Sequence, residues 1–203
     1  MKYILHHNDI PGDIEVTGSI AVDTEALGLN PKRDSLCLVQ LRTEAGPAHL
    51  VRLERNNYDA PNLKALLTNS DIVKIFHYAR YDMGMLRHYL GTAVAPVYCT
   101  KIASKLARTY TDKHGLKDLL RELLGVDISK QQQSSDWGAP KLSKQQLEYA
   151  ATDVEHLHAL RNKLQDILER EGRDALAKKC FDFLSTQVEL DLAGWAEQNI
   201  FSH

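Results

Sequence analysis

Apolar residues follow different patterns in the two halves of this chain. In the first half, segments 19–27, 35–44 and 47–53 are rich in apolar and β-branched residues, and Gly, Pro, Asn and Asp separate them. This pattern is typical of β-strands joined by turns. A short apolar run at about 72–76 and a segment near Val97 are two further strand candidates.

Helical patterns appear between the later strands and then dominate. We expect a short helix over 61–69, a longer one over 79–90 and another after the strand near Val97. From about Leu116 onward the pattern is mostly helical. Strands that alternate with helices after a run of adjacent strands predict an α/β fold, a sheet covered by helices. No linker or internal repeat interrupts the pattern, so residues 1–203 are expected to form a single domain.

One helix has an unusually clear beginning. Ser143 is a good N-cap, and Gln146 three residues later completes a capping box. Leu142 and Leu147 occupy the positions of a hydrophobic staple. The sequence therefore predicts a helix from Lys144 to about Glu171.

Two carboxylates lie in an apolar strand. Asp23 and Glu25 are two residues apart, so in a strand they point to the same face, while Ile20 and Val22 point to the other and can be buried. Two like charges on one face repel each other and do not stabilise a sheet. A divalent cation between them would explain the arrangement.

Two more acids lie at the edges of apolar helical stripes. Asp82 shares a helical face with Leu86, and Asp153 shares one with Ala150 and with Tyr149, four residues earlier. A lone acid in such a place is more often a cap or a partner in a salt bridge. Because a buried carboxylate needs a partner, four acids and a tyrosine in these places favour a common site.

Composition restricts the class of partner. The formal net charge of −2 argues against coating long nucleic acid through bulk electrostatics, but it permits a local grip on a short oligonucleotide. The three cysteines, Cys37, Cys99 and Cys180, are an odd number without ligand-like spacing, which favours reduced thiols in a cytoplasmic protein. We expect no signal peptide and no membrane span, which would need about 20 apolar residues.

Three motifs carry a resemblance to a known family. D-T-E at 23–25, H-Y-A-R-Y-D at 77–82 and Y-A-A-T-D at 149–153 resemble, in order and spacing, the three motifs of the DEDD 3′–5′ exonucleases. The histidine subclass carries His five residues before the last Asp. Glu148 stands there and Tyr149 follows, so the chain resembles the tyrosine subclass.

The resemblance extends beyond the motifs. Residues 114–160 are similar to the corresponding region of ribonuclease D, whose C-terminal HRDC domains are expected to be absent here. A chain of this length that ends in ELDLAGWAEQNIFSH resembles the nanoRNase C oligoribonucleases. This resemblance implies a ribonuclease H-like mixed β-sheet and hydrolysis of very short RNAs down to dinucleotides. It also implies a homo-oligomer, for which an octamer is the expected form.

The resemblance also implies roles for the five site residues. Asp23 would bridge two divalent ions, Mg²⁺ or Mn²⁺, which suit hard oxygen ligands. Glu25 and Asp153 would complete the first ion site, and Asp82 would act at the second. Tyr149 would orient the attacking water, since a phenol with an ordinary pKa near 10 is a poor base at neutral pH.

Candidate substrate contacts are less specific. Leu29 would wedge between the last two bases, or else is a plain loop or core leucine. The backbone near Thr24 would contact the terminal nucleotide, and His77 would bind a phosphate or sugar, although a lone histidine is more often structural. Tyr81 and Trp137 would stack on bases, or else belong to the core.

Two further segments carry expectations. Lys130 and residues 131–135 would face the substrate channel or form a solvated loop. From about Arg173 the tail 173–203 combines helical spacing with a large apolar load, so it would pack on its own domain or lie in a subunit interface. Given the resemblance, we expect the interface.

Two other functions remain possible on the sequence alone. One is a broader 3′–5′ exonuclease on longer RNA, tRNA ends or DNA, because the same motifs would serve it. The other is a non-catalytic nucleic-acid-binding or scaffold protein that retains the fold. Retention of all four acids and the tyrosine disfavours the second.

Overall fold

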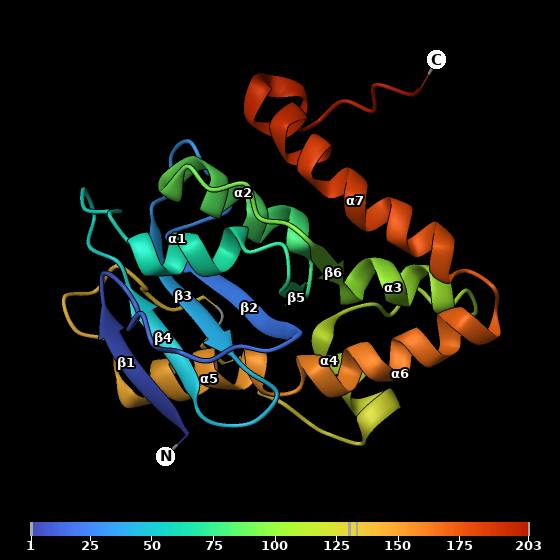
Figure 1. Cartoon of the computed structure of the whole chain (residues 1–203), viewed down its shortest axis with the longest axis horizontal. Helices are drawn as coiled ribbons and strands as arrows, with labels where there is room; N and C mark the ends of the chain where they lie inside the picture. Colours follow the sequence, from blue (N-terminus) through green and yellow to red (C-terminus); the bar gives the residue numbers. More distant parts are fainter. Residues whose placement is uncertain (1, 130, 133, 203) are drawn as a thin grey trace.

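The computed structural model describes residues 2–129, 131–132 and 134–202, and a mixed six-stranded sheet forms its centre (Figure 1). The strand order is β1-β4-β3-β2-β5-β6. β3 runs antiparallel to both of its neighbours, whereas the other neighbouring pairs are parallel. The strands are β1 (Tyr3–His7), β2 (Ser19–Ala26), β3 (Leu36–Arg42), β4 (Ala48–Arg52), β5 (Val73–Phe76) and β6 (Val97–Cys99).

Helices cover both faces of the sheet. In Figure 1, α1 and α2 lie on one side of it, whereas α5 lies on the other side, with α6 next to it. The helical elements are α1 (Pro61–Thr68), α2 (Ala79–Leu90), α3 (Thr100–Ala107), α4 (Leu116–Leu119), η1 (Leu120–Leu124), α5 (Lys144–Glu155), α6 (Leu157–Arg170), α7 (Asp174–Leu190) and η2 (Asp191–Trp195). The predicted α/β fold with a helical C-terminal half is confirmed.

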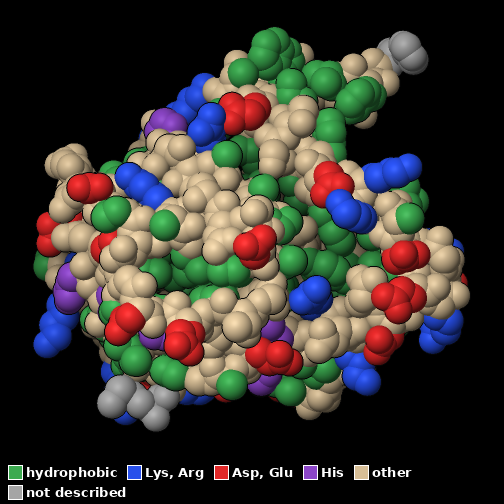
Figure 2. Space-filling model, in the orientation of Figure 1, with side chains coloured by type: hydrophobic (Ala, Val, Ile, Leu, Met, Phe, Trp, Pro, Cys, Tyr) green, Lys and Arg blue, Asp and Glu red, His purple; other side chains and the backbone are tan. Residues whose placement is uncertain are grey.

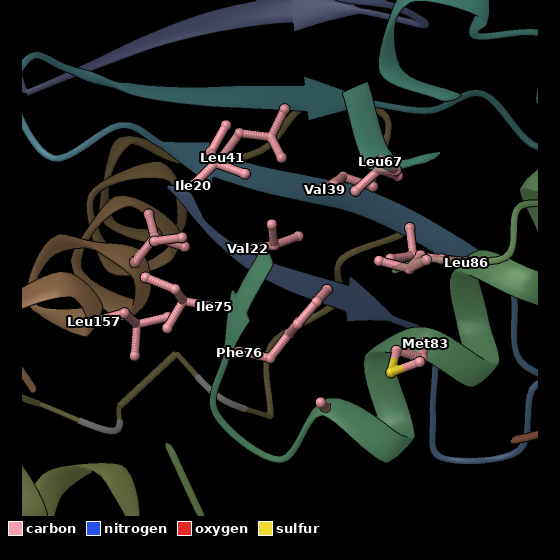
Figure 3. Close-up of a cluster of buried hydrophobic side chains, with 14 of the residues drawn as sticks. Ile20, Val22, Val39, Leu41, Leu67, Ile75, Phe76, Met83, Leu86 and Leu157 are labelled. Atoms are coloured by element: carbon pink, nitrogen blue, oxygen red, sulfur yellow. The ribbon is translucent and has the colours of Figure 1, made fainter. Parts of the chain in front are cut away.

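The alternation predicted for β2 is present. Ile20 and Val22 are buried in the cluster that Figure 3 shows, together with Val39 from β3, Phe76 from β5 and Leu86 from α2. Burial of this apolar face fixes the register of β2, because a slip of one residue would turn the carboxylates into the cluster that Ile20 and Val22 occupy. Asp23 and Glu25 are therefore held on the opposite face.

The structure corrects the predicted helix 144–171. Two helices are present, α5 and α6. His156 separates them, because its backbone (φ −111°, ψ 2°) is not helical. α5 packs across β2, β3 and β4, while α6 packs against α3. Both segments have helical periodicity, so the change of direction at one residue leaves no signal in the pattern.

Strand β1 was not predicted. Its segment ends in two histidines and lacks the apolar alternation of a half-buried strand, because it forms an edge of the sheet and pairs only with β4 in the described residues. Among the described residues no helix is both long and apolar enough to cross a membrane.

Candidate active site

Three carboxylates meet where β2 and α5 face each other. Asp23, Glu25 and Asp153 each offer one oxygen, and these oxygens all lie within 4.8 Å of one another. The structure thus brings the acidic pair of β2 and the acid of the late helix close together, which the shared site predicted from the sequence requires. Clustered carboxylate oxygens are the ligands that Mg²⁺ and Mn²⁺ prefer, so the residues fit a divalent metal site.

The capping box explains how α5 delivers Asp153. The Ser143 hydroxyl accepts a hydrogen bond from the Gln146 amide at 3.2 Å, and the Gln146 side-chain oxygen accepts one from the Ser143 amide at 2.9 Å. The first turn is thus fixed as the sequence predicts. Ala150 and Val154 are fully buried and turn the adjacent Asp153 towards β2.

Asp82 approaches β2 differently. It is 2% exposed, and its Oδ1 accepts a hydrogen bond of 2.7 Å from the Thr24 hydroxyl. The side chain of Thr24 alternates to the face opposite Asp23 and Glu25, the face on which α2 packs. The charge of Asp82 nevertheless acts on Asp23 and Glu25, so Asp82 lies near the three-carboxylate cluster without being part of it. The structure makes Thr24 a hydroxyl donor to Asp82, which the sequence did not indicate.

Without a cation, the buried carboxylates of the site repel one another. Burial, followed by repulsion from Asp82, Asp153 and Glu25, raises the pKa of Asp23 well above its usual range. Burial and the charge of Asp153 raise the pKa of Glu25 to about 9. Burial raises the pKa of Asp82 to about 7, although the bond from Thr24 opposes this shift. A bound cation would relieve this repulsion.

Tyr149 adjoins the cluster. Burial and the neighbouring charges of Asp153 and Glu25 raise the pKa of the Tyr149 phenol. The phenol also makes a hydrogen bond with the Asp153 side chain. Tyr149 therefore keeps its proton at neutral pH. This state fits the predicted role of orienting water better than that of a base.

The prediction that Trp137 stacks on bases is not favoured by its surroundings. Its side chain is 3% exposed, and its ring centroid lies 6.2 Å from that of Tyr149. A buried indole offers little surface to a base. Trp137 instead supports Tyr149 from the side.

Other predicted substrate residues have mixed surroundings. Leu29 is 82% exposed, which excludes the core alternative and suits a wedge. His77 lies with its Nδ1 2.9 Å from the Thr100 hydroxyl. The Tyr81 hydroxyl donates to the Gly28 carbonyl at 2.8 Å, so it ties a helix to a loop as well as adjoining Asp82. Lys130 and Gln133 of the predicted channel segment lie outside the described residues.

Sequence reasoning missed Gln40. It pairs with Asp23 across β2 and β3, is fully buried, and its Nε2 lies 3.4 Å from an Asp23 oxygen. Within the described residues its Oε1 has no hydrogen-bond partner. A glutamine inside the apolar run LCLVQL was the available signal, because a buried amide needs a polar partner.

The class of protein follows from comparison with known families. Residues 7–169 match the family described as 3′–5′ exonuclease, and the chain belongs to this family. Ribonuclease D from Gluconacetobacter diazotrophicus is 36% identical over 156 residues, which are 76% of this chain and 39% of that protein. The chain thus spans about two fifths of the length of this curated relative.

Solved structures give a nearer likeness. Brucella melitensis NrnC with bound Mg²⁺ is 52% identical with a TM-score of 0.96, and the match covers all of both chains. NrnC from the same organism bound to pGG is 53% identical with a TM-score of 0.97, over 100% of this chain and 99% of that one. Escherichia coli RNase D, 25% identical, matches with a TM-score of 0.75 over 85% of this chain and 45% of that one. The ribonuclease H-like fold is confirmed.

Proposed function

We propose that this protein is a divalent-metal-dependent 3′–5′ exoribonuclease that hydrolyses short oligoribonucleotides, especially dinucleotides, to 5′-mononucleotides. The observation that carries the proposal is the convergence of Asp23, Glu25 and Asp153 within 4.8 Å. Membership of the 3′–5′ exonuclease family supports the direction of cleavage. The relatives named ribonuclease D support RNA as the substrate.

Each residue of the candidate site has its own role in the proposed reaction. Asp23, Glu25 and Asp153 would hold two Mg²⁺ or Mn²⁺ ions, with Asp82 at the second. When bound, such ions supply Lewis-acid activation of water and neutralise the leaving 3′-oxygen. The protonated Tyr149, fixed by its bond to Asp153, orients the attacking water towards phosphorus. Thr24 fixes the Asp82 carboxylate through its hydroxyl.

Short RNA is the substrate that we favour. NrnC, similar to this chain over its whole length, has been solved with pGG bound. Leu29 protrudes from the loop after β2, which suits a wedge between two terminal bases. Backbone near Thr24 and the side chains of His77 and Tyr81 would complete the contacts with the nucleotide.

A broader exonuclease on longer RNA, tRNA ends or DNA is the second candidate, favoured by the ribonuclease D relatives. A time course on 5′-labelled RNA of two, five and twenty nucleotides with Mg²⁺, Mn²⁺ or EDTA separates the two. We expect the dinucleotide to disappear fastest and EDTA to stop cleavage. Equal rates on all three lengths would favour the broader enzyme, and an inactive protein would refute both. Asp153→Asn is the catalytic control.

We further propose that the protein is a homo-oligomer in the cytoplasm, with an octamer as the assembly that the family resemblance suggests. The exposed apolar side chains of the 173–203 segment support assembly, because patches of this kind mark interfaces. The thiols of Cys37, Cys99 and Cys180 are free, as expected for a reducing compartment.

A further inference from the structure

The segment that carries Leu29 is a closed loop with its own internal support. We call residues 28–34 the Leu29 loop. At its base the Leu27 amide donates to the Ser35 carbonyl at 3.1 Å. Inside it the Asn30 carbonyl accepts from the amide of Asp34 at 2.8 Å. These bonds define a compact turn, on which Leu29 stands exposed.

The Asp34 carboxylate fills the centre of the Leu29 loop. It is 8% exposed, and its Oδ2 accepts a hydrogen bond from the Asn30 amide at 3.0 Å. It also lies so close to Gly28 that a Cβ at that position would overlap it. Arg33 donates to both of its oxygens at 2.7 and 2.8 Å, so the carboxylate stays charged. Glycine at 28 and aspartate at 34 are thus matched in shape.

The Leu29 loop is also attached to α2. The Tyr81 hydroxyl donates to the Gly28 carbonyl at 2.8 Å. One turn later, a Cβ on Gly84 would lie 3.7 Å from Pro31, so helix and loop are in close packing. The same helix carries Asp82, which immediately follows Tyr81. The contacts therefore connect the apolar tip of the loop to the carboxylate site through one rigid element.

We propose that Asp34 and Tyr81 are positioning residues that hold the Leu29 loop rigidly against α2, and so fix where Leu29 meets the bases relative to the carboxylates. The inference rests on the proposed function. A preorganised loop binds a two-base substrate without a cost for ordering itself. Loosening the loop should weaken the grip on the second base and leave the chemistry at phosphorus intact.

Paired substrates test this directly. Cleavage of the diribonucleotide pGG is compared with that of an analogue in which the 5′ nucleotide, the one that leaves through its 3′-oxygen, lacks its base. Both substrates are tested with wild-type protein and with Asp34→Ala. We expect wild type to prefer pGG, and Asp34→Ala to reduce this preference about tenfold, mainly through a higher KM for pGG. Asp59→Ala, which makes the same change at an exposed residue, should behave as wild type.

Two further variants address the mechanism. Gly28→Ala should also lose the preference because of overlap with Asp34, and Asp34→Ala added to it should cause little further loss, since the overlap is gone. If circular dichroism shows that Asp34→Ala does not fold, Tyr81→Phe is the second test. This variant loses the hydroxyl that donates to the Gly28 carbonyl but keeps the ring proposed to contact the nucleotide, and it should shift the preference in the same direction.

The outcomes separate the inference from the proposed function. The positioning role would be overturned if a variant lost cleavage equally on both substrates, or if both Asp34→Ala and Tyr81→Phe kept the preference for pGG. In either case cleavage by the wild-type protein would still support the proposed function. Failure of wild type to cleave either substrate with Mg²⁺ or Mn²⁺ would refute the function and the inference with it.

Discussion

At the residue scale, burial and mutual repulsion raise the pKa values of the carboxylates in the candidate active site. The pKa of Glu25 is raised from 4.5 to about 9, and that of Asp82 from 3.8 to about 7. A folded state with raised acid pKa values binds more protons than the unfolded chain between the two values, so its stability falls as pH rises through that range. Ionisation of the clustered carboxylates thus lowers the stability of the folded protein as the pH rises through neutrality.

This linkage predicts a pH-dependent effect of metal. In EDTA, the melting temperature should fall between about pH 5 and pH 9, and Mg²⁺ should raise it more at pH 8 than at pH 6, where protons compete for the carboxylates. Thermal unfolding followed by circular dichroism measures both effects. Glu25→Gln removes one of these carboxylates, so its melting temperature in EDTA should depend less on pH. The pH dependence that remains in this variant comes from other titrating groups. A metal effect that is equal at both pH values would contradict the prediction.

Gln40 supplies a second prediction. Gln40→Leu keeps the volume of the buried side chain but removes the donor beside Asp23. Partners of metal ligands commonly change affinity or activity by 10- to 100-fold, so we expect activity to fall by about tenfold and more Mg²⁺ to be needed. Mg²⁺ titration of cleavage measures this. Gln145→Leu, at an exposed position on α5, is the control, and equal metal requirements for the two variants would argue against a role for Gln40.

Residues differ in how far the sequence reveals them. Asp23 and Glu25 were predictable because strand alternation fixes their common face without knowledge of any partner. Gln40 and the hydroxyl of Thr24 were not, because their contacts come from register and from packing between elements distant in sequence. The burial of Trp137 likewise depends on where its loop meets α5, which local pattern does not encode.

At the element scale, the beginning of α5 was predictable and its end was not. A capping box is a local device of four residues, whereas the break at His156 follows from two different packing partners. Strand β1 lay beyond prediction for the same reason, since its pairing with β4 is non-local. Local chemistry therefore predicts where elements begin better than where tertiary packing redirects them.

The capping box gives a prediction at this scale. Ser143→Ala removes the acceptor for the Gln146 amide and should lower the free energy of unfolding by about 1 kcal/mol. Because α5 carries Tyr149 and Asp153, cleavage should also fall modestly at temperatures near the melting point. Urea unfolding measures the loss. Ser143→Asp retains a capping acceptor and should restore stability, and equal losses in the two variants would contradict the role of the cap.

At the scale of the whole molecule, the C-terminal segment contacts α2, the helix that carries Asp82. Ala177, Phe181, Leu184 and Val188 form the buried face of α7. Arg80, within the second motif, donates to both Asp191 oxygens at 2.6 and 2.7 Å and to the Ala196 carbonyl at 3.0 Å. The segment beyond α7 thus meets the same helix that carries Tyr81 and Asp82.

The outer side of this segment is apolar. Phe183 on α7 contacts Phe201 with ring centroids 6.0 Å apart, and both remain exposed. Leu176, Trp195 and Ile200 are also exposed. Figure 2 shows hydrophobic side chains on the surface at this end of the molecule, where α7 projects from the body in Figure 1. Water contact with so many large apolar groups is costly, so a second copy of the chain is the cover we propose.

Removing part of this surface tests the assembly. Trp195→Ser combined with Phe201→Ser should lower the mass measured by light scattering, because two exposed aromatic anchors of the kind that dominate interfaces are lost. The fold should persist, since both side chains lie outside the buried core. Ile4→Ser, a comparable change on β1 far from α7 in Figure 1, should leave the mass unchanged. An unaltered mass in the double variant, with its circular dichroism intact, would show that subunits meet elsewhere.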